Sequence, residues 1–340
     1  MRPLARVYVE ALRRRGVQVL LVTSDQHPES DDARDYEIVL DPRFRTASTW
    51  TPTVAAYRRI RRWRPDLVVT ELVRDPRWIA LAGNAPRIDL VHDDREHDPH
   101  ERRPRHESAV FDRWAANAVA TVTFSDYVAE ALRDRRGLRG GIVRTVPLTS
   151  DLDGRFVPPF VAAADRRDFV LIGRLNRYKN LDVVLAAWQA HVDGSHWRGD
   201  NLVLLGDGPI AGRMLPKHTV WQPGAYRYRD VAGTIAAAKG CIAHYRRASQ
   251  SGVQVLAMQL GVTPIVSTVG ALPEFQPQGC APVGVDDAAG LSAAFDTLAD
   301  PATALRHGAA AAVHYAVHFA ADRAAERLLT VIDDVRRVAS

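Results

Sequence analysis

This chain of 340 residues contains only two cysteines and three lysines. Cys241 and Cys280 each lie in or beside a strand-like run, so we expect buried free thiols rather than a disulfide or a metal site. No apolar run approaches the roughly 18 residues that span a bilayer. The first 16 residues hold neither a long apolar segment nor a cleavage site of small residues, so we expect a cytoplasmic protein.

Arginine supplies 42 of the 45 basic residues, and the formal net charge is +5 with a pI near 9.4. This mild excess suits polyanionic ligands, anionic lipid or nucleic acid and selects none of them. The sequence shows no base-reading module and no pattern of stacking aromatic residues, so we expect no nucleic-acid partner.

Strand-like apolar runs alternate with helical patterns along nearly the whole chain, which predicts right-handed βαβ units and parallel sheets. The length suits two domains of about 150 residues each. Residues 148–167 interrupt the alternation with two prolines and no clear period. We therefore expect an α/β protein with one Rossmann-like domain at 1–150, a second at 151–320, and a C-terminal helix at 321–340 that packs back toward the first.

The expected elements of the first half are helices at 3–15, 53–64, 76–83, 106–119 and 126–136 and strands at 17–23, 36–40, 66–72, 87–93, 121–125 and 141–147. Those of the second half are strands at 169–173, 201–207, 219–222, 241–245, 263–268 and 281–285 and helices at 180–192, 209–215, 228–239, 251–261 and within 286–338. Ligands of open α/β sheets bind at the carboxyl ends of the strands. We therefore look for site residues in the loops that follow the strands.

The stretch VLIGRLNRYKN (170–180) holds one of the three lysines just past a predicted strand end. The strand ends at Gly173, and Arg174 and Lys179 flank the loop before the next helix. The planar fork of arginine and the mobile point charge of lysine both suit a diphosphate. The alternative is a pair of solvated loop cations.

The stretch LVLLGDGP (202–209) is a predicted strand followed by Gly206, Asp207 and Gly208. Glycines allow a backbone to approach a ligand closely, and Pro209 suits the first position of a helix. This motif alone is weak, because many α/β proteins have such turns.

A third loop, ASQSGVQVLAM (248–258), follows the predicted strand at 241–245. Ser249 or Ser251 can cap a helix that begins near Gly252, and the free N–H groups of such a helix form an anion site. The segment TPIVSTVGALPEF follows, with a strand, a glycine turn and a short acidic motif.

In the first half, HDDREH (92–97) follows a predicted strand, which places His92 and Asp93 at a strand end. His92 could act as a general base, as a hydrogen-bond donor to a sugar hydroxyl, or as an ordinary loop residue. The spacing of His92, His97, His100 and His106 fits no single helical face, so we expect no metal site.

The stretches GRLNRYKNLD, LLGDGP and PIVSTVGALPE, in this order and spacing, resemble the retaining family-4 glycosyltransferases of the GT-B fold. RPDLVVTEL, RIDLVHD and TFSDYVAEAL in the first half resemble the same family, so the resemblance covers nearly the whole chain. It is nearest to a subgroup with a Thr/Ser-Gln-Ser-Gly-Val segment, here 249–253, and a His-Asp-x-x-x-His segment, here 92–97.

The resemblance implies two Rossmann-like domains whose parallel sheets face an interdomain cleft. It also implies retaining, metal-independent transfer of a sugar from a nucleoside-diphosphate sugar, a substrate rather than a cofactor, to a glycan, glycolipid or small-molecule acceptor. Arg174 and Lys179 match the positions that hold the donor diphosphate and meet the charge of the leaving group. His92 matches a position near the transferred sugar, where we expect it to stabilise the transition state rather than act as a base.

The other donor-side residues that the resemblance implies are Gly173, Gly206, Asp207, Gly208, Trp221, Gln222, Ser249, Gln250, Ser251, Gly252 and Val253. Asp93 and His97 are implied on the acceptor side.

The chain departs from the family pattern in two places. Most members carry two glutamates eight residues apart, where this chain has Ser249 and Ala257, and Ala257 cannot hold the donor ribose. The family also begins with a strand and a glycine-rich loop, whereas this sequence begins within the helix that follows them. These departures favour the alternative of a non-catalytic protein that binds glycan or a partner transferase, and the motifs favour the enzyme.

The segment TVAAYRRIRRWRP (53–65) predicts an amphipathic helix. Its apolar stripe consists of Val54, Tyr57, Ile60 and Trp63, and four arginines, Arg58, Arg59, Arg61 and Arg62, lie largely off it. These arginines form either a solvated face or a surface that binds the anionic inner face of the membrane. Such binding would gain about 1 kcal/mol of free energy per cation.

Overall fold

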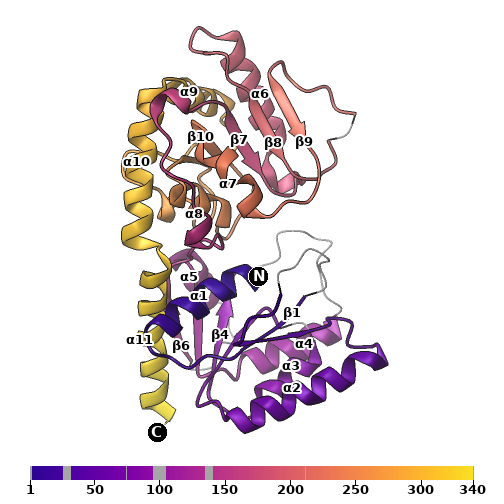
Figure 1. Cartoon of the computed structure of the whole chain (residues 1–340). Helices are drawn as coiled ribbons and strands as arrows, with labels where there is room; N and C mark the ends of the chain where they lie inside the picture. Colours follow the sequence, from indigo (N-terminus) through magenta and orange to yellow (C-terminus); the bar gives the residue numbers. More distant parts are fainter. Residues whose placement is uncertain are drawn as a thin grey trace. The chain divides into compact units, whose positions relative to one another are not determined.

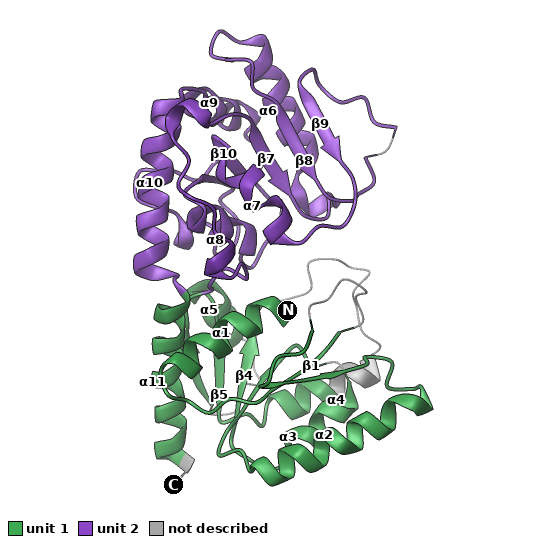
Figure 2. Cartoon of the chain, in the orientation of Figure 1, with its two compact units in different colours: residues 1–94, 100–147, 321–340 green, residues 95–99, 148–320 purple. Residues whose placement is uncertain are grey.

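The computed structural model describes residues 2–25, 32–73, 75–94, 105–134, 141–210 and 212–339. Within this part the chain divides into two units (Figures 1 and 2). Unit 1 holds the described residues up to Pro147 together with the segment from Ala321 onward. Unit 2 holds Leu148–Ala320.

Unit 2 is built on a five-stranded parallel sheet with the order β11-β10-β7-β8-β9. Its strands are β7 (Phe169–Ile172), β8 (Leu202–Leu205), β9 (Thr219–Gln222), β10 (Gly240–Ala243) and β11 (Thr263–Val266). The chain runs outward from β7 through β8 to β9 and then returns to the other side of β7. The order therefore reverses between β7 and β10, which is where ligands of such sheets bind.

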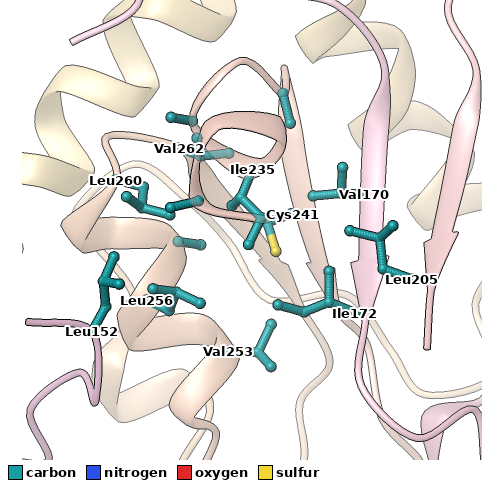
Figure 3. Close-up of a cluster of buried hydrophobic side chains, with 14 of the residues drawn as sticks. Leu152, Val170, Ile172, Leu205, Ile235, Cys241, Val253, Leu256, Leu260 and Val262 are labelled. Atoms are coloured by element: carbon teal, nitrogen blue, oxygen red, sulfur yellow. The ribbon is translucent and has the colours of Figure 1, made fainter. Parts of the chain in front are cut away.

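Four strands of unit 2, β7, β8, β10 and β11, are buried on both faces because helices cover both sides of the sheet, whereas the edge strand β9 is partly exposed. Val170 and Ile172 of β7 pack in one apolar cluster with Leu205, Cys241 and Leu256 (Figure 3). The alternate residues of β7 face a second cluster that includes Trp188 and Phe295. The helices are α6 (Leu181–Asp193), α7 (Tyr228–Ala236), α8 (Gly252–Gln259), α9 (Ala288–Ala299) and α10 (Pro301–His318).

Unit 1 contains a parallel pair, β1 (Leu21–Ser24) with β2 (Glu37–Leu40), and a separate four-stranded parallel sheet. The strands of that sheet are β3 (Val68–Glu71), β4 (Arg87–Val91), β5 (Ala120–Thr123) and β6 (Ile142–Thr145), in that order. The helices are α1 (Arg2–Arg14), α2 (Trp50–Trp63), α3 (Pro76–Ala82), α4 (Arg105–Ala115), α5 (Asp126–Asp134) and α11 (Ala321–Ala339). α11 packs against α1, so the end of the chain joins the unit formed by its beginning.

The predicted α/β class and the parallel sheets are confirmed. Two predicted elements are wrong. The described residues of 209–215 form turns rather than a helix, because Gly212 has a positive φ of 80° and the segment is too short to bury a helical face. Residues 281–285 are not a strand, because Val283 makes only an isolated bridge to Ser267.

One statement about side chains needs correction, and the apolar stripe of α2 can now be described by its burial. Cys241 is buried as a free thiol, but the free thiol of Cys280 is only half-buried. Of the predicted apolar stripe on α2 only Ile60 is buried, next to Thr53 and Ala56 on the same face. The rest of the stripe is exposed, because those residues lie on the side of the helix that faces away from the unit. In the described part of the chain, no helix is long and apolar enough to cross a membrane.

Candidate functional site

The loop after β7 turns Lys179 back onto the end of its own strand. A short 3-10 helix, Arg177–Lys179, leads into Asn180, whose left-handed backbone (φ 54°) begins α6. Lys179 Nζ donates hydrogen bonds to the carbonyl of Ile172, at 3.1 Å, and to the hydroxyl of Tyr245, at 2.8 Å. Gly173 has a φ of 110°, and a Cβ there would lie 3.1 Å from Nζ. The absence of a side chain at Gly173 therefore leaves room for the side chain of Lys179.

The two predicted cations of this loop differ in environment. Arg174 is exposed, whereas Lys179 is 3% exposed, so the alternative of a pair of solvated loop cations is wrong for Lys179. Burial lowers the pKa of Lys179, and the charge of Arg174 adds to this effect. Among the described residues no carboxylate lies within ion-pair distance of Lys179. A buried ammonium without an anion is costly, so this site favours an anionic ligand.

The loop after β10 brings a hydroxyl to the same place. Ser251 caps α8, since its Oγ accepts a hydrogen bond from the N–H of Gln254 at 3.2 Å, and this confirms one of the two predicted caps. Ser251 Oγ also lies 3.2 Å from the hydroxyl of Tyr245, the group that holds Lys179. The loop after β10 is thereby connected to the loop after β7.

Gly252 marks open space at the start of α8. A Cβ at this position would meet no atom within 4 Å, and its φ is not in the left-handed region, so packing within the free protein does not require glycine here. The first N–H groups of a helix have no partner within the helix. Together these features leave room for an anion to approach the backbone of Gly252. The side chain of Val253 packs in the core, so only its backbone can face a ligand.

The loop after β11 rests on the segment that leads to α8. The N–H of Ala271 donates to the carbonyl of Ser249 at 3.1 Å, and Ser249 is fully buried. Gly270 has a φ of 58°, and a Cβ there would lie 1.8 Å from the carbonyl oxygen of Ala248. The glycine of the STVGALPE stretch is therefore needed for contact between two loops. Gln250, between the two serines, is half-buried.

The glycines after β8 also allow two loops to contact each other. A Cβ at Gly206 would lie 2.5 Å from the carbonyl oxygen of Gly173, and one at Gly208 would lie 2.5 Å from Cβ of Leu175. The N–H of Leu175 donates to the carbonyl of Asp207 at 2.7 Å. These glycines bring the loop onto the 173–175 backbone, which accounts for them without a ligand.

Trp221 and Gln222 lie beside that loop. Trp221 Nε1 donates to the carbonyl of Gly206 at 2.9 Å, and the N–H of Gly206 donates to the carbonyl of Gln222 at 3.0 Å. The carboxylate of Asp207 accepts from the N–H of Gly224 at 2.7 Å. The Asp207 side chain therefore orders the turn after β9.

Ala257 lies inside the core and has no exposed surface. It belongs to the apolar cluster of Figure 3, together with Val170 and Ile172. No polar group of this side chain is available to a ribose, which agrees with the departure noted in the sequence.

In unit 1, His92 and Glu71 meet at the ends of neighbouring strands. His92 follows β4 and Glu71 ends β3, and Nε2 lies 2.6 Å from Oε1. The imidazole is 8% exposed and its ring centroid lies 4.6 Å from that of Phe124. Glu71 is the second-last residue of the stretch RPDLVVTEL and the last residue of β3, but no sequence pattern singled it out.

Of the two predicted acceptor-side residues, Asp93 and His97, the structure describes one. Asp93 is half-buried next to His92. His97 and His100 lie outside the described residues. Among the residues that are described, no group of three or more His, Cys, Asp or Glu side chains is arranged to hold a metal ion.

The structure therefore gathers two sets of groups. At the strand ends of unit 2, Gly173, Lys179, Ser251 and the start of α8 meet at the reversal of strand order and offer positive charge and hydrogen-bond donors. Trp221 and Gln222 lie further along the same edge. In unit 1, an imidazole is held by a carboxylate.

Comparison with known proteins gives two family matches. The model described as Glycosyltransferase Family 4 matches residues 5–153, and the model described as Glycosyl transferases group 1 matches residues 166–300. No curated protein matches the chain.

Solved structures of similar fold cover nearly the whole chain. Sucrose-phosphate synthase from Thermosynechococcus elongatus has a TM-score of 0.74 at 20% identity, over 99% of this chain and 93% of its own. HepE from Anabaena, in complex with UDP-glucose, has a TM-score of 0.63 at 13% identity, over 93% and 100%. A trehalose-6-phosphate synthase, from work on glycosyl transfer with retention, has a TM-score of 0.66 at 10% identity, over 98% and 96%.

Proposed function

The chain belongs to the family 4 and group 1 glycosyltransferases of the GT-B fold, and from this premise we propose the reaction it catalyses. It moves a sugar from a nucleoside-diphosphate sugar to a saccharide or lipid-linked acceptor, with the anomeric configuration retained and without a metal ion. The observation that carries the proposal is Lys179, a buried cation without a carboxylate partner in the described structure, beside the start of α8.

The groups at this edge suit the diphosphate of such a donor. Lys179 has three N–H donors and uses two of them, so one remains for a phosphate oxygen. The backbone N–H of Gly252 and the exposed guanidinium of Arg174 add further donors. When the bond to the sugar breaks, negative charge grows on the departing diphosphate, and fixed positive groups stabilise it. Cations and N–H donors do not ligate a metal ion, which favours a metal-independent reaction.

Retention and the choice of donor draw support from the similar structures. One of them is described with UDP-glucose and another in connection with glycosyl transfer with retention. We propose that His92 contacts the transferred sugar and stabilises the transition state, with Glu71 holding the ring in place. The imidazole is nearly buried and fixed on two sides, so it is preorganised for such a contact.

The experiment that tests the function is a donor panel with the purified chain. UDP-, GDP- and ADP-sugars are incubated with and without EDTA, and release of nucleoside diphosphate is followed. We expect turnover with one donor class, unaffected by EDTA. Arg174→Ala should abolish it, whereas Arg177→Ala, a change of another exposed arginine in the same loop, should leave most of it. Wild-type chain that turns over no donor, or equal loss in both variants, would contradict the proposal.

The exposed face of α2 supports peripheral contact with an anionic membrane. Trp50, Val54, Tyr57 and Trp63 are each 40–49% exposed, and the helix contains no acidic residue. Four neighbouring arginines are exposed and form no ion pair with a described carboxylate: Arg58, Arg61, Arg62 and Arg64. Aromatic side chains next to arginines suit the interface of an anionic bilayer.

Vesicle co-sedimentation tests this contact. The chain should bind vesicles that contain phosphatidylglycerol, bind phosphatidylcholine vesicles less, and lose binding at high salt. Replacing Arg58, Arg61 and Arg62 with serine should weaken binding. Replacing Arg198, Arg213 and Arg306, three exposed arginines of unit 2, should not. Equal binding to both kinds of vesicle would contradict an electrostatic contact.

A further inference from the structure

Tyr245 joins the two loops of the proposed diphosphate site. Its hydroxyl lies 2.8 Å from Lys179 Nζ and 3.2 Å from Ser251 Oγ. All three side chains are at least nine-tenths buried. Tyr245 follows β10 in the stretch CIAHY, and no sequence motif singled it out. One hydroxyl group therefore contacts both the cation of one loop and the helix cap of the next.

The hydrogen bond between Tyr245 and Ser251 can run in either direction, and one direction leaves a donor on Ser251 for a ligand. The ammonium of Lys179 only donates, so the oxygen of Tyr245 accepts. In the arrangement that leaves a donor for a ligand, the hydroxyl of Tyr245 donates to Ser251 Oγ, which also accepts from the N–H of Gln254. The proton of Ser251 and the third proton of Lys179 have no acceptor among the described residues. Both remain for a ligand, and both belong to groups fixed by the same tyrosine.

We infer that Tyr245 is a positioning residue: it orders Lys179 and Ser251 so that both donate to one diphosphate group. The inference rests on the proposed function and adds that the two contacts are coupled. Hydrogen bonds in such a chain polarise one another, so a phosphate that accepts from Ser251 also strengthens the bond between Tyr245 and Lys179. The loss of the tyrosine hydroxyl should therefore weaken both contacts together.

Around Lys179, none of the groups that the structure describes supplies the negative charge that a ligand would bring. Its Nζ lies 4.2 Å from the ring centroid of Tyr245 and 5.6 Å from that of Tyr178. Burial raises the pKa of Tyr245 and that of the Cys241 thiol, so both stay neutral near pH 7. The remaining charged neighbour is Arg174, which repels the ammonium. A diphosphate would be the first anion at this site.

Binding should consequently be linked to protonation. Burial lowers the pKa of Lys179 in the free protein, and a bound diphosphate raises it again, so the complex takes up a proton at any pH between the two values. Affinity is highest below the pKa of the free lysine and falls as the pH rises above it. Without the hydroxyl of Tyr245 the ammonium loses an acceptor, which moves this fall to lower pH.

The test is isothermal titration calorimetry of the whole chain with UDP, GDP, ADP and inorganic pyrophosphate. Titrations across pH, in buffers of different ionisation enthalpy, measure affinity and proton uptake. We expect Tyr245→Phe to weaken nucleoside-diphosphate binding roughly tenfold to a hundredfold, the effect of a lost hydrogen bond to a charged group, and to shift the pH dependence downward. Tyr315→Phe, which removes a buried hydroxyl of α10 that lies next to Thr149, is the matched control and should change neither.

A second variant separates positioning from folding. Ser251→Ala alone should weaken binding, but in the Tyr245→Phe background it should cost less than it does alone, because the two contacts act together. Multiplicative losses in the double variant, or a Tyr245→Phe chain with wild-type affinity and pH dependence, would overturn the inference and leave the proposed function intact. Wild-type chain that binds none of the four probes would overturn both.

Discussion

At the scale of single residues, the glycines of the motifs have two different explanations. Gly206, Gly208 and Gly270 allow loops of unit 2 to pack on one another. Gly252 has open space in front of it, and Gly173 makes room for Lys179. A motif read from sequence alone treats all of these glycines as ligand contacts. The structure separates the glycines that allow loops to contact one another from those that leave room for a ligand or for Lys179.

Gly173→Ala tests whether the position of the Lys179 side chain depends on the glycine. An alanine at a φ of 110° is strained by about 1–3 kcal/mol, and its methyl group would press on Nζ at 3.1 Å. We expect the free energy of unfolding to fall by that amount and nucleoside-diphosphate affinity to fall more than about tenfold, since Lys179 must move. Gly154→Ala, where a Cβ meets nothing, is the control for urea unfolding and calorimetry. Unchanged affinity in Gly173→Ala would show that this lysine does not bind the donor.

Glu71→Ala tests the orientation of His92. Without the carboxylate at 2.6 Å the imidazole loses its hydrogen-bond partner on the β3 side. We expect kcat to fall about tenfold to a hundredfold with little change in donor KM, because a misplaced group costs the transition state more than the ground state. Glu130→Ala, an exposed change on α5, should leave both constants unaltered in steady-state assays. A Glu71→Ala enzyme with wild-type kcat would rule out this role.

At the scale of elements, a buried charge cluster fastens α1 to β2. The side chain of Glu37 has no exposed surface, and it accepts hydrogen bonds from Arg6, at 2.6 and 2.7 Å, and from Arg2, at 3.1 Å. Burial alone would raise the pKa of this carboxyl group. The hydrogen bonds from the two arginines outweigh burial and lower the pKa to about 2. The carboxylate is therefore the form on which the contact between α1 and β2 depends.

Glu37→Gln should destabilise the chain by about 3–5 kcal/mol, because two buried arginines lose their anion. The pH dependence follows from the sign of the shift. The folded pKa lies below the unfolded value of about 4.3, so the stabilisation is complete above that value and is lost as the pH falls toward about 2. Urea unfolding at pH 7 and pH 3 measures both effects.

The control for this cluster is Asp35→Asn, which breaks an exposed pair with Arg13. It should cost less than about 1 kcal/mol. If Glu37→Gln unfolds at the same urea concentration as wild type, or keeps the wild-type loss of stability at low pH, the buried cluster is not what fastens α1.

The elements themselves were largely predictable from sequence, because alternating apolar runs and helical patterns are local signals. The run FVLI became β7, and Ser251 became the predicted cap of α8. The failures occurred where the signal was short. PIAGRM (209–214) contains a proline and a glycine and is too short to form a helix with a buried face, and residues around Val283 make a single bridge.

The site was predictable only in part, because proximity in space leaves little trace in sequence. Lys179 and Ser251 were found from their motifs, since each lies in a loop after a strand. Tyr245 and Glu71 were missed, because what singles them out is the partner they meet, Lys179 in one case and His92 in the other. The amphipathic pattern of α2 was visible in the sequence, but the pattern alone did not show that Val54, Tyr57 and Trp63 are exposed.

At the scale of the whole molecule, the fold is preserved although the sequence is not. A structure only 20% identical covers 99% of the chain, so what persists is the alternation of strands and helices and the loops at the strand ends. Fold alone does not fix function. The assignment of a donor site therefore depends on the geometry around Lys179.

The central claim is that a diphosphate binds where the strand order of unit 2 reverses, on Lys179 and the start of α8. A crystal structure of the chain with the nucleoside diphosphate it binds tests this most directly. The account predicts a phosphate oxygen within hydrogen-bond distance of Lys179 Nζ and of the N–H of Gly252, next to Ser251. A nucleotide bound elsewhere, with Lys179 still held only by Ile172 and Tyr245, would contradict it.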